Sequence, residues 1–147
     1  MELKVAESQI DFFNLMHIRS SVFVNEQQVP IDIELDAQDY QATHLLLMDG
    51  AIPVGCCRII TQGRTAHLGR IAIDKAYRHQ GLGRLLMEKT EVYVTQHRYQ
   101  QIDLNAQIQA QGFYEALGYH SIGDIFSEAN IDHVRMVKAI EDSSFTR

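Results

Sequence analysis

The chain has 147 residues, 46% of them hydrophobic, and a formal net charge of −6. This length suits one domain with a sizeable core and is too short for two. The negative charge argues against a nucleic-acid partner, which would need a basic face. The sequence contains no apolar run near the ~18 residues of a membrane span and begins without the features of a signal peptide, so we expect a cytoplasmic protein with no membrane partner.

The first part of the chain predicts a strand, a helix and a polar segment. Residues 3–5 are typical of a short edge strand. Apolar side chains recur at helical spacing over residues 10–23, behind Ser8 as a suitable N-cap, and predict a helix that breaks near Ser20. The polar residues between this helix and residue 43 contain few Gly or Pro, which favours an ordered segment over a linker.

Three consecutive antiparallel strands follow, over residues 43–48, 52–61 and 65–74. The first two are separated by Asp49-Gly50, a dipeptide typical of hairpin turns, and the next turn contains Gln62-Gly63. The only cysteines, Cys56 and Cys57, are adjacent in the second strand, a spacing that suits neither a disulfide nor a metal site. We interpret them as buried strand residues and expect no metal.

The second half of the chain predicts a helix and then a strand that pairs in parallel. The helix begins at Gly81 and runs to about Arg98, and a short strand around residues 102–104 follows. Because a helix separates this strand from the one over residues 65–74, the two strands should be parallel. The remaining predicted elements are a helix over 109–117 that Gly118 ends, strands over 119–125 and 131–139, and a loop over 126–130.

The stretch from Ile71 to Arg84 carries the clearest functional signal. An apolar strand ends there, a polar turn follows, and Gly81 and Gly83 open the next helix. The first N–H groups of a helix lie at the positive end of its dipole and suit a phosphate. The stretch lacks the third glycine of a dinucleotide fingerprint and the Gly-Lys-Ser/Thr ending of a P-loop, so it favours a different kind of pyrophosphate cradle.

At these residues the sequence resembles the GNAT superfamily of acyl-CoA-dependent N-acyltransferases. Its central motif, Gln/Arg-x-x-Gly-x-Gly/Ala, is matched by Arg78, Gly81 and Gly83, and a second signature, Phe-Tyr-x-x-x-Gly-Phe/Tyr, is matched by residues 113–119. Residues 19–30 are similar to a bacterial subgroup typified by the ElaA and YjcF proteins, with the later acidic and histidine positions supplied by Asp36, Asp39 and His44. The resemblance then covers nearly the whole chain.

The resemblance implies an α+β, three-layer α/β/α GNAT fold. Its central sheet is mixed and mostly antiparallel, with a splayed parallel strand pair and helices on both faces. Residues 1–141 would form a single N-acetyltransferase domain, followed by a polar tail over 142–147. In this family the region before residue 43 folds over the acceptor end of the site.

The resemblance also implies that acetyl-CoA is the co-substrate. Its pantetheine arm would pair with the backbone of the splayed strand, since an unpaired strand edge has spare N–H and C=O groups. Many GNATs carry Asn where this chain has Gln107, and Asn105 lies two residues earlier. The expected cofactor-binding residues are Ile71, Ala72, Ile73, Arg78, His79, Gln80, Gly81, Leu82, Gly83, Arg84, Asn105 and Gln107.

Acyl transfer to an amine needs a neutral amine, a polarised thioester carbonyl and a proton for the departing thiolate. A backbone N–H near Ala72 could polarise the carbonyl. In the family the tyrosine matched by Tyr114 is the general acid, and a phenol with a pKa near 10 can protonate a thiolate. The base candidates are Glu26, Asp36, Asp39, His44, Glu128 and His133, with Glu26 first as a catalytic residue and His133 second.

The acceptor is expected to be a small cationic primary amine. Six carboxylates and no Lys or Arg lie between Ser20 and Cys57, so this segment carries a charge of −6 that would attract a cation. The expected substrate-binding residues are Glu26, Gln27, Asp36, His44 and His133. Two alternatives stay open, namely a non-catalytic acyl-CoA-binding or sensing module and an acetyltransferase of protein N-termini or lysines, and a homodimer is also open.

Overall fold

The computed structural model describes residues 1–140, so the predicted polar tail over 142–147 lies outside the described residues. By their contacts the residues form two compact units. The first unit comprises Met1–Ile60 and Arg70–Thr90, and the second comprises Thr61–Gly69 and the chain from Glu91 onward. Within residues 1–140, no helix is both long and apolar enough to cross a membrane.

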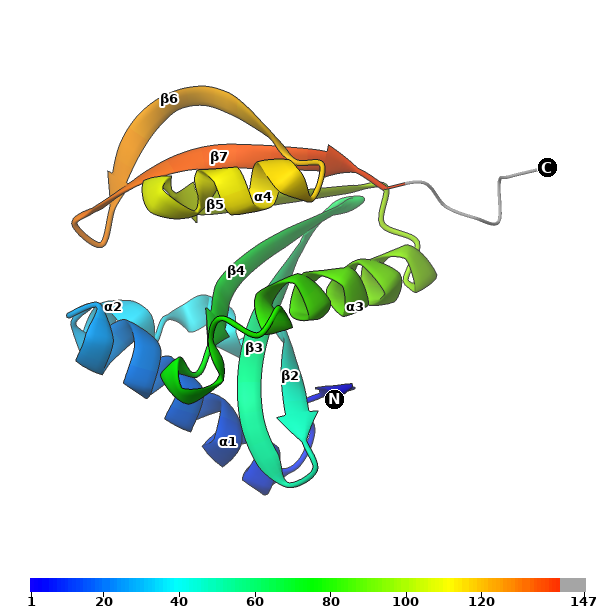
Figure 1. Ribbon diagram of the computed structural model, residues 1–147. Helices are drawn as coiled ribbons and strands as arrows, with labels where there is room; N and C mark the ends of the chain where they lie inside the picture. Colours follow the sequence, from blue (N-terminus) through cyan, green and yellow to red (C-terminus); the bar gives the residue numbers. More distant parts are fainter. Residues whose placement is uncertain (141–147) are drawn as a thin grey trace. The chain divides into compact units, whose positions relative to one another are not determined.

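Seven strands form one sheet in the order β1-β2-β3-β4-β5-β7-β6 (Figure 1). The pair β4 and β5 is parallel, with Thr65 to Leu68 opposite Gln101 to Leu104, as the crossover helix predicted. The pairs β1–β2, β2–β3, β5–β7 and β6–β7 are antiparallel. The strands are β1 Glu2–Val5, β2 Thr43–Asp49, β3 Ile52–Gln62, β4 Thr65–Ile73, β5 Gln101–Gln107, β6 His120–Glu128 and β7 Ile131–Ala139.

The helical segment of the first unit begins as the sequence predicts. Ser8 caps helix α1, Gln9–Arg19, by accepting a hydrogen bond from the Asp11 N–H, and the Asp11 carboxylate reaches back to the cap. The predicted break near Ser20 is a change of helix type, because a π-helix over Ser20–Glu26 follows directly.

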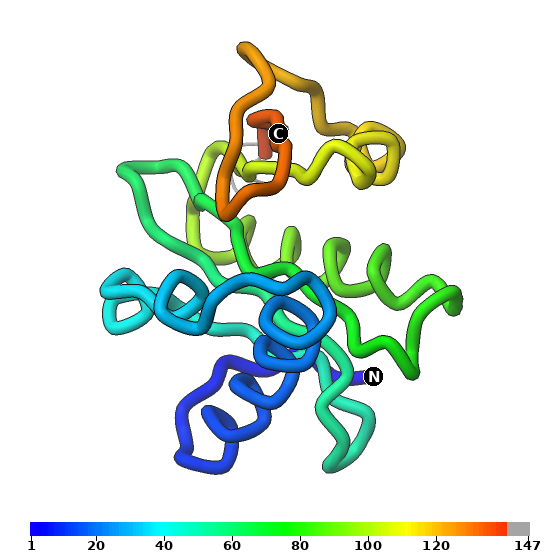
Figure 2. The backbone as a smooth tube through the Cα atoms, turned by 90° about the vertical axis from the view of Figure 1, so that its left-hand side faces the viewer, coloured from blue at the N-terminus to red at the C-terminus, as the bar shows by residue number. Residues whose placement is uncertain are grey.

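The segment before β2 is ordered, as its composition predicted. It contains the short helix α2, Ile31–Glu34, and the 3₁₀ turn η2, Ala37–Tyr40. Figure 2 shows its backbone as successive short turns between α1 and β2. We call residues 30–40, which hold both elements, the α2–η2 segment.

The core of the first unit lies between α1 and the strands. Leu15 and Ile18 on α1 are fully or almost fully buried and pack against residues of β2, β3 and β4. The whole hydrophobic cluster consists of Ala6, Leu15, Ile18, Val22, Leu46, Met48, Cys56 and Ala72. Both Cys56 and Cys57 are free and buried, which confirms their interpretation as buried strand residues. Burial raises the pKa of the Cys56 thiol to about 12, so this thiol stays protonated at neutral pH.

The second unit contains a β-hairpin whose loop is shorter than predicted. Strand β6 continues to Glu128, and only Ala129 and Asn130 separate it from β7. Both residues have positive φ, 52° and 61°, the backbone of a tight two-residue hairpin turn. The predicted loop over 126–130 was too long because Ala129 gives no sign of a left-handed backbone in the sequence.

Four further helical elements carry or flank the motif residues. Helix α3, Leu82–Gln96, follows the 3₁₀ turn η3, Lys75–Tyr77. Helix α4, Gln111–Ala116, follows the 3₁₀ turn η4, Ile108–Ala110. Gly118, with φ 97°, lies directly after the Leu117 C-cap of α4, the position predicted for it.

Candidate functional site

The loop that leads into α3, residues 78–84, lies in the first unit, and we call it the glycine loop. Gly81 has φ 76°, and a Cβ built on it would meet no protein atom within 4 Å. The Leu85 N–H donates to the Gly81 carbonyl at 3.1 Å, and this is the first intrahelical bond of α3. The N–H groups of Leu82, Gly83 and Arg84 precede that bond, so they are free of the helix's own ladder and lie at the positive end of its dipole.

Arg78 and Glu26 form a two-pronged ion pair. Two guanidinium nitrogens of Arg78 lie 2.5 and 2.6 Å from the Glu26 carboxylate oxygens, and Arg78 Nε donates to the Ile73 carbonyl at 3.0 Å. The hydrogen bond from Arg78 lowers the pKa of Glu26, and the same bond raises the pKa of Arg78. The ion pair thus joins Arg78, an expected cofactor-binding residue, to Glu26, the first candidate for the general base.

The remaining loop residues keep their side chains near the surface. His79, with φ 63°, and Gln80 are exposed. Arg84 is exposed and lies 3.4 Å from Glu88, one helical turn along α3. These positions suit contacts with a ligand that approaches the loop from solvent.

The strand that leads into the loop is packed closely against β3. A Cβ at Gly55 would lie 2.9 Å from the Ala72 carbonyl oxygen and 2.7 Å from an Ile73 side-chain carbon, so only glycine fits there. The Asp74 N–H donates to the Val54 carbonyl at 2.8 Å. The backbone of Ile71 to Ile73 is therefore held at a fixed position within the first unit.

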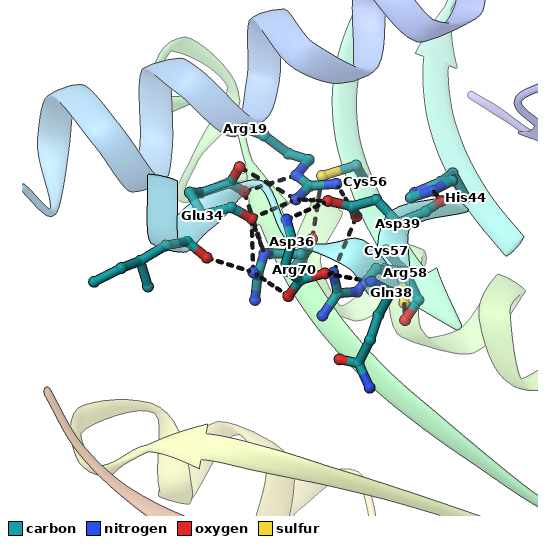
Figure 3. A network of polar contacts seen from close by, with 11 residues as sticks. Arg19, Glu34, Asp36, Gln38, Asp39, His44, Cys56, Cys57, Arg58 and Arg70 are labelled. Carbon is teal, nitrogen blue, oxygen red and sulfur yellow. Dashed lines mark hydrogen bonds and ion pairs between the residues drawn. The ribbon is translucent and has the colours of Figure 1, made fainter. Parts of the chain in front are cut away.

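Three arginines and three carboxylates gather in the first unit, and we call Arg19, Glu34, Asp36, Asp39, Arg58 and Arg70 the arginine–carboxylate cluster (Figure 3). Arg19 is 1% exposed and bonds Glu34 at 2.7 Å and Asp39 at 2.8 Å. Arg58 lies 2.9 Å from Asp36 and 3.0 Å from Asp39. Burial favours the neutral form of Asp39, but the hydrogen bonds from Arg19 and Arg58 outweigh it and lower the Asp39 pKa.

This cluster corrects the charge argument made from the sequence. Four of the six carboxylates between Ser20 and Cys57, namely Glu26, Glu34, Asp36 and Asp39, are paired with arginines that lie outside that segment. Their partners Arg19, Arg58, Arg70 and Arg78 offset those charges. The segment is acidic in sequence, but most of its negative charge is neutralised at close range in the fold.

Two more expected substrate residues belong to the first unit. His44 is buried, with Nε2 2.9 Å from the Asp39 carbonyl and its ring edge-on to Phe12 at 5.9 Å. His44 Nδ1 has no hydrogen-bond partner among the described residues. Gln27 is half-buried and ends the π-helix through its N–H bond to the Val22 carbonyl.

Tyr114 lies in an aromatic group of the second unit. It is buried, and its ring packs edge-on against Phe113 at 5.0 Å and Tyr119 at 5.8 Å. The Tyr119 hydroxyl donates to Glu91 at 2.8 Å. Backbone N–H groups of Leu117 and Tyr119 both donate to the Tyr114 carbonyl. Two aromatic neighbours and two backbone hydrogen bonds thus hold Tyr114 in place.

The second unit also brings together the remaining candidates. The Asn105 amide donates to Glu128 at 3.2 Å, and His133 Nε2 lies 3.8 Å from the same carboxylate. His133 is buried, stacks on Phe126 and faces the Ile131 carbonyl through Nδ1 at 2.6 Å. Gln107, directly opposite His133 in the β5–β7 register, lies 2.5 Å from the Gln109 amide. Asn105, Glu128 and His133 thus form one polar group.

The second unit also contains one polar cluster that was not expected from the sequence. His67 Nδ1 lies 2.7 Å from Asp103, and Arg135 Nε donates to the other oxygen of the same buried carboxylate at 3.0 Å. The sequence predicts that β4 and β5 are parallel, but only the register seen in the structure makes His67 and Asp103 direct partners. Their separation in sequence concealed the pair.

The comparisons with known proteins agree with these features. An acetyltransferase (GNAT) domain family matches residues 15–140. The N-acetyltransferase YjcF of Bacillus subtilis is 32% identical over 139 residues, which cover 94% of this chain and 99% of YjcF.

Solved structures show the same fold. The crystal structure of Escherichia coli ElaA has a TM-score of 0.83 at 25% identity and covers 93% of this chain and 98% of ElaA. An aminoglycoside 6'-N-acetyltransferase complexed with coenzyme A has a TM-score of 0.77 at 16% identity, with 96% and 98% of the two chains covered. The mixed sheet with its parallel β4–β5 pair is the GNAT fold that the sequence predicted. With its matched domain model and its glycine loop at the start of α3, this chain belongs to the GNAT family of acetyltransferases.

Proposed function

We propose that this GNAT enzyme transfers the acetyl group of acetyl-CoA to a primary amine. The observation that carries the proposal is the glycine loop, where Gly81 leaves open space beside the first N–H groups of α3. A pyrophosphate can accept from the N–H groups of Leu82, Gly83 and Arg84, which precede the first bond of the helix.

The rest of the cofactor would use backbone and amide groups. The strand residues Ile71, Ala72 and Ile73 offer peptide groups to the amides of the pantetheine arm. Asn105 and Gln107 are the proposed side-chain contacts, and Arg78, His79 and Gln80 the proposed contacts of the loop. Arg78 would have to share or release Glu26 to reach a phosphate, since Glu26 engages two of its guanidinium nitrogens.

The transfer itself is a direct attack. The amine nitrogen forms a bond to the thioester carbon, the carbon–sulfur bond breaks, and the sulfur leaves as a thiolate. We propose that the Tyr114 hydroxyl gives this thiolate its proton, because a phenol and a thiol have similar acidity. The proton lost from the amine passes to a base or to water, so the N-acetylated amine, which is an amide, and the free thiol of coenzyme A are the products.

The acceptor is proposed to be a small primary amine, which carries a proton at neutral pH because its pKa is near 10. The charge of the stretch between Ser20 and Cys57 supports this less than its sequence suggested, because arginines pair four of its six carboxylates. Glu26 can hold an ammonium only when Arg78 releases it, and its lowered pKa makes it a poor base. His133, beside Glu128, is the alternative that needs no such release.

The Gly81→Asn substitution tests the placement of the cofactor. Asn tolerates the positive φ of Gly81, so the variant should fold, while its side chain fills the space proposed for the phosphate. We expect coenzyme A affinity in calorimetry to fall by at least about tenfold, because the variant displaces charge-assisted hydrogen bonds.

Gly63→Asn is the matched control, since Gly63 has φ 62° and open space but lies at the turn between β3 and β4. This variant should bind coenzyme A as the wild type does. Equal affinities of wild type and Gly81→Asn would place the phosphates elsewhere.

A further inference from the structure

Arg70 has a backbone conformation that is unusual for its residue type and its place. Its φ is 49°, and it is the one residue of β4 among the non-glycine residues with positive φ in the described chain. The left-handed region is unfavourable for a residue with a Cβ, so such a backbone persists where surrounding contacts hold it. Arg70 also begins the stretch of β4 that belongs to the first unit.

The side chain of Arg70 supplies those contacts by binding the α2–η2 segment. Its guanidinium donates to the Glu34 carbonyl from two nitrogens, at 2.7 and 3.1 Å, and to Asp36 at 3.1 Å (Figure 3). A second carbonyl, that of Ile33, lies 3.4 Å from the guanidinium. The last carbonyls of a helix have no partner within it, so Arg70 satisfies the end of α2.

The main chain of Arg70 is held from a second direction. The Cys56 thiol, buried on β3, donates to the Arg70 carbonyl at 3.2 Å. Arg19 donates to the same Glu34 carbonyl that Arg70 binds, at 2.8 Å, so the α2 end is itself fixed to α1. The bend in β4 at Arg70 is thus held by the Cys56 thiol of β3 and by the end of α2, which Arg19 of α1 also binds.

The residues directly after this clamp are Ile71, Ala72 and Ile73, whose peptide groups are the proposed partners of the pantetheine arm. We propose that Arg70 is a positioning residue, whose side chain locks the bend of β4 onto the α2–η2 segment and so aims these peptide groups at the cofactor's arm. This inference rests on the proposed use of acetyl-CoA. It predicts that Arg70 acts on the arm of the cofactor and leaves the phosphate contacts at Gly81 unchanged.

The test compares two ligands on the Arg70→Gly variant. Glycine keeps the left-handed backbone available but removes the clamp. Coenzyme A carries the pantetheine arm, whereas ADP carries the pyrophosphate without it. With two backbone hydrogen bonds of the arm weakened, coenzyme A affinity should fall by about tenfold, while ADP affinity should change by less than about twofold. In turnover, the KM for acetyl-CoA should rise and the KM for the amine should stay unchanged.

Arg98→Gly is the matched control, because Arg98 is also an arginine with positive φ, 67°, but is exposed in the turn after α3. It should bind both ligands as the wild type does. If Arg70→Gly does not fold, Arg70→Lys replaces it, since lysine keeps the charge but offers one nitrogen where Arg70 bonds through both Nε and Nη2. A folded Arg70→Lys protein should show the same selective loss for coenzyme A.

Wild-type affinity for coenzyme A in either folded Arg70 variant would overturn the inference, and so would an equal loss for coenzyme A and ADP. Failure of the wild-type protein to bind coenzyme A would instead overturn the proposed function, and the positioning role with it. Calorimetry on the Arg70 variants therefore tests the positioning role, and calorimetry on the wild-type protein tests the proposed function.

Discussion

Tyr114 is the residue on which the proposed chemistry depends most. Its ring packs edge-on against Phe113 and Tyr119, so Tyr114→Phe should preserve these ring contacts and remove the hydroxyl that is the proposed proton donor. We expect turnover to fall about 10² to 10⁴-fold, the usual cost of losing a general acid, with coenzyme A affinity nearly unchanged. Steady-state kinetics and calorimetry on the same preparation measure both quantities.

Tyr119→Phe provides the control, because it removes a neighbouring hydroxyl that bonds Glu91 rather than a proposed reactant. This variant should lose some thermal stability and keep its turnover. If Tyr114→Phe turned over within about twofold of wild type, with the chemical step rate-limiting, Tyr114 would be a packing residue and another group would protonate the thiolate.

Glu26 offers a second test at the level of one side chain. Its carboxylate occupies Arg78, so Glu26→Gln should free the guanidinium for a cofactor phosphate. Both side chains are about one-third exposed, so the gain in coenzyme A affinity should be about two- to fivefold. Weaker binding of coenzyme A by Glu26→Gln would mean that the ion pair orients Arg78 for the cofactor. Asp49→Asn, an exposed carboxylate at the β2–β3 turn, controls for the loss of one charge.

At the scale of elements, local signals in the sequence located most boundaries correctly. Ser8 marks the start of α1, Asp49-Gly50 the first hairpin, and Gly118 the end of α4. Each of these signals acts within a few residues of the chain, so it can be read without the fold. The bend at Arg70 could not be predicted, because arginine does not indicate a left-handed backbone and the partners of its side chain are 34 to 37 residues away.

The contribution of the α2–η2 segment to the free energy of unfolding should depend on pH, because its carboxylates are paired with arginines. The pKa of Asp39 is lowered from 3.8 in the folded chain, so its ionised form stabilises the fold above that pH. This stabilisation is lost as the pH falls below about 4, towards the folded-state pKa. We expect the free energy of unfolding, from urea titrations at a series of pH values, to decrease over that acidic range.

Asp39→Asn should show a smaller slope over the same range and a loss of about 3 kcal/mol at neutral pH, because two buried arginines lose a charged partner. Asp32→Asn, an exposed position on α2, should match the wild type at every pH. A wild-type slope in Asp39→Asn would show that other carboxylates cause the acid sensitivity.

At the scale of the molecule, the sequence predicted the family, the parallel pairing of β4 with β5 and the position of the glycine loop. The sequence did not predict which charged side chains form ion pairs in the fold. Glu26 and Arg78 are 52 residues apart, and Arg19 and Asp39 are 20 apart, so a count of charges along the chain treats each as isolated. Ion pairs of this kind depend on tertiary contacts, which composition does not contain.

The most direct test of the proposed acetyl transfer is an assay with the purified protein and acetyl-CoA. Thiol release should accelerate on addition of at least one amine from a panel of polyamines, amino sugars, amino acids and basic peptides, and mass spectrometry should show one acetyl group added to its nitrogen. A reaction with peptides alone would assign the enzyme to protein acetylation. Tight coenzyme A binding with no thiol release for any amine would contradict the proposed catalysis and leave an acyl-CoA-binding module.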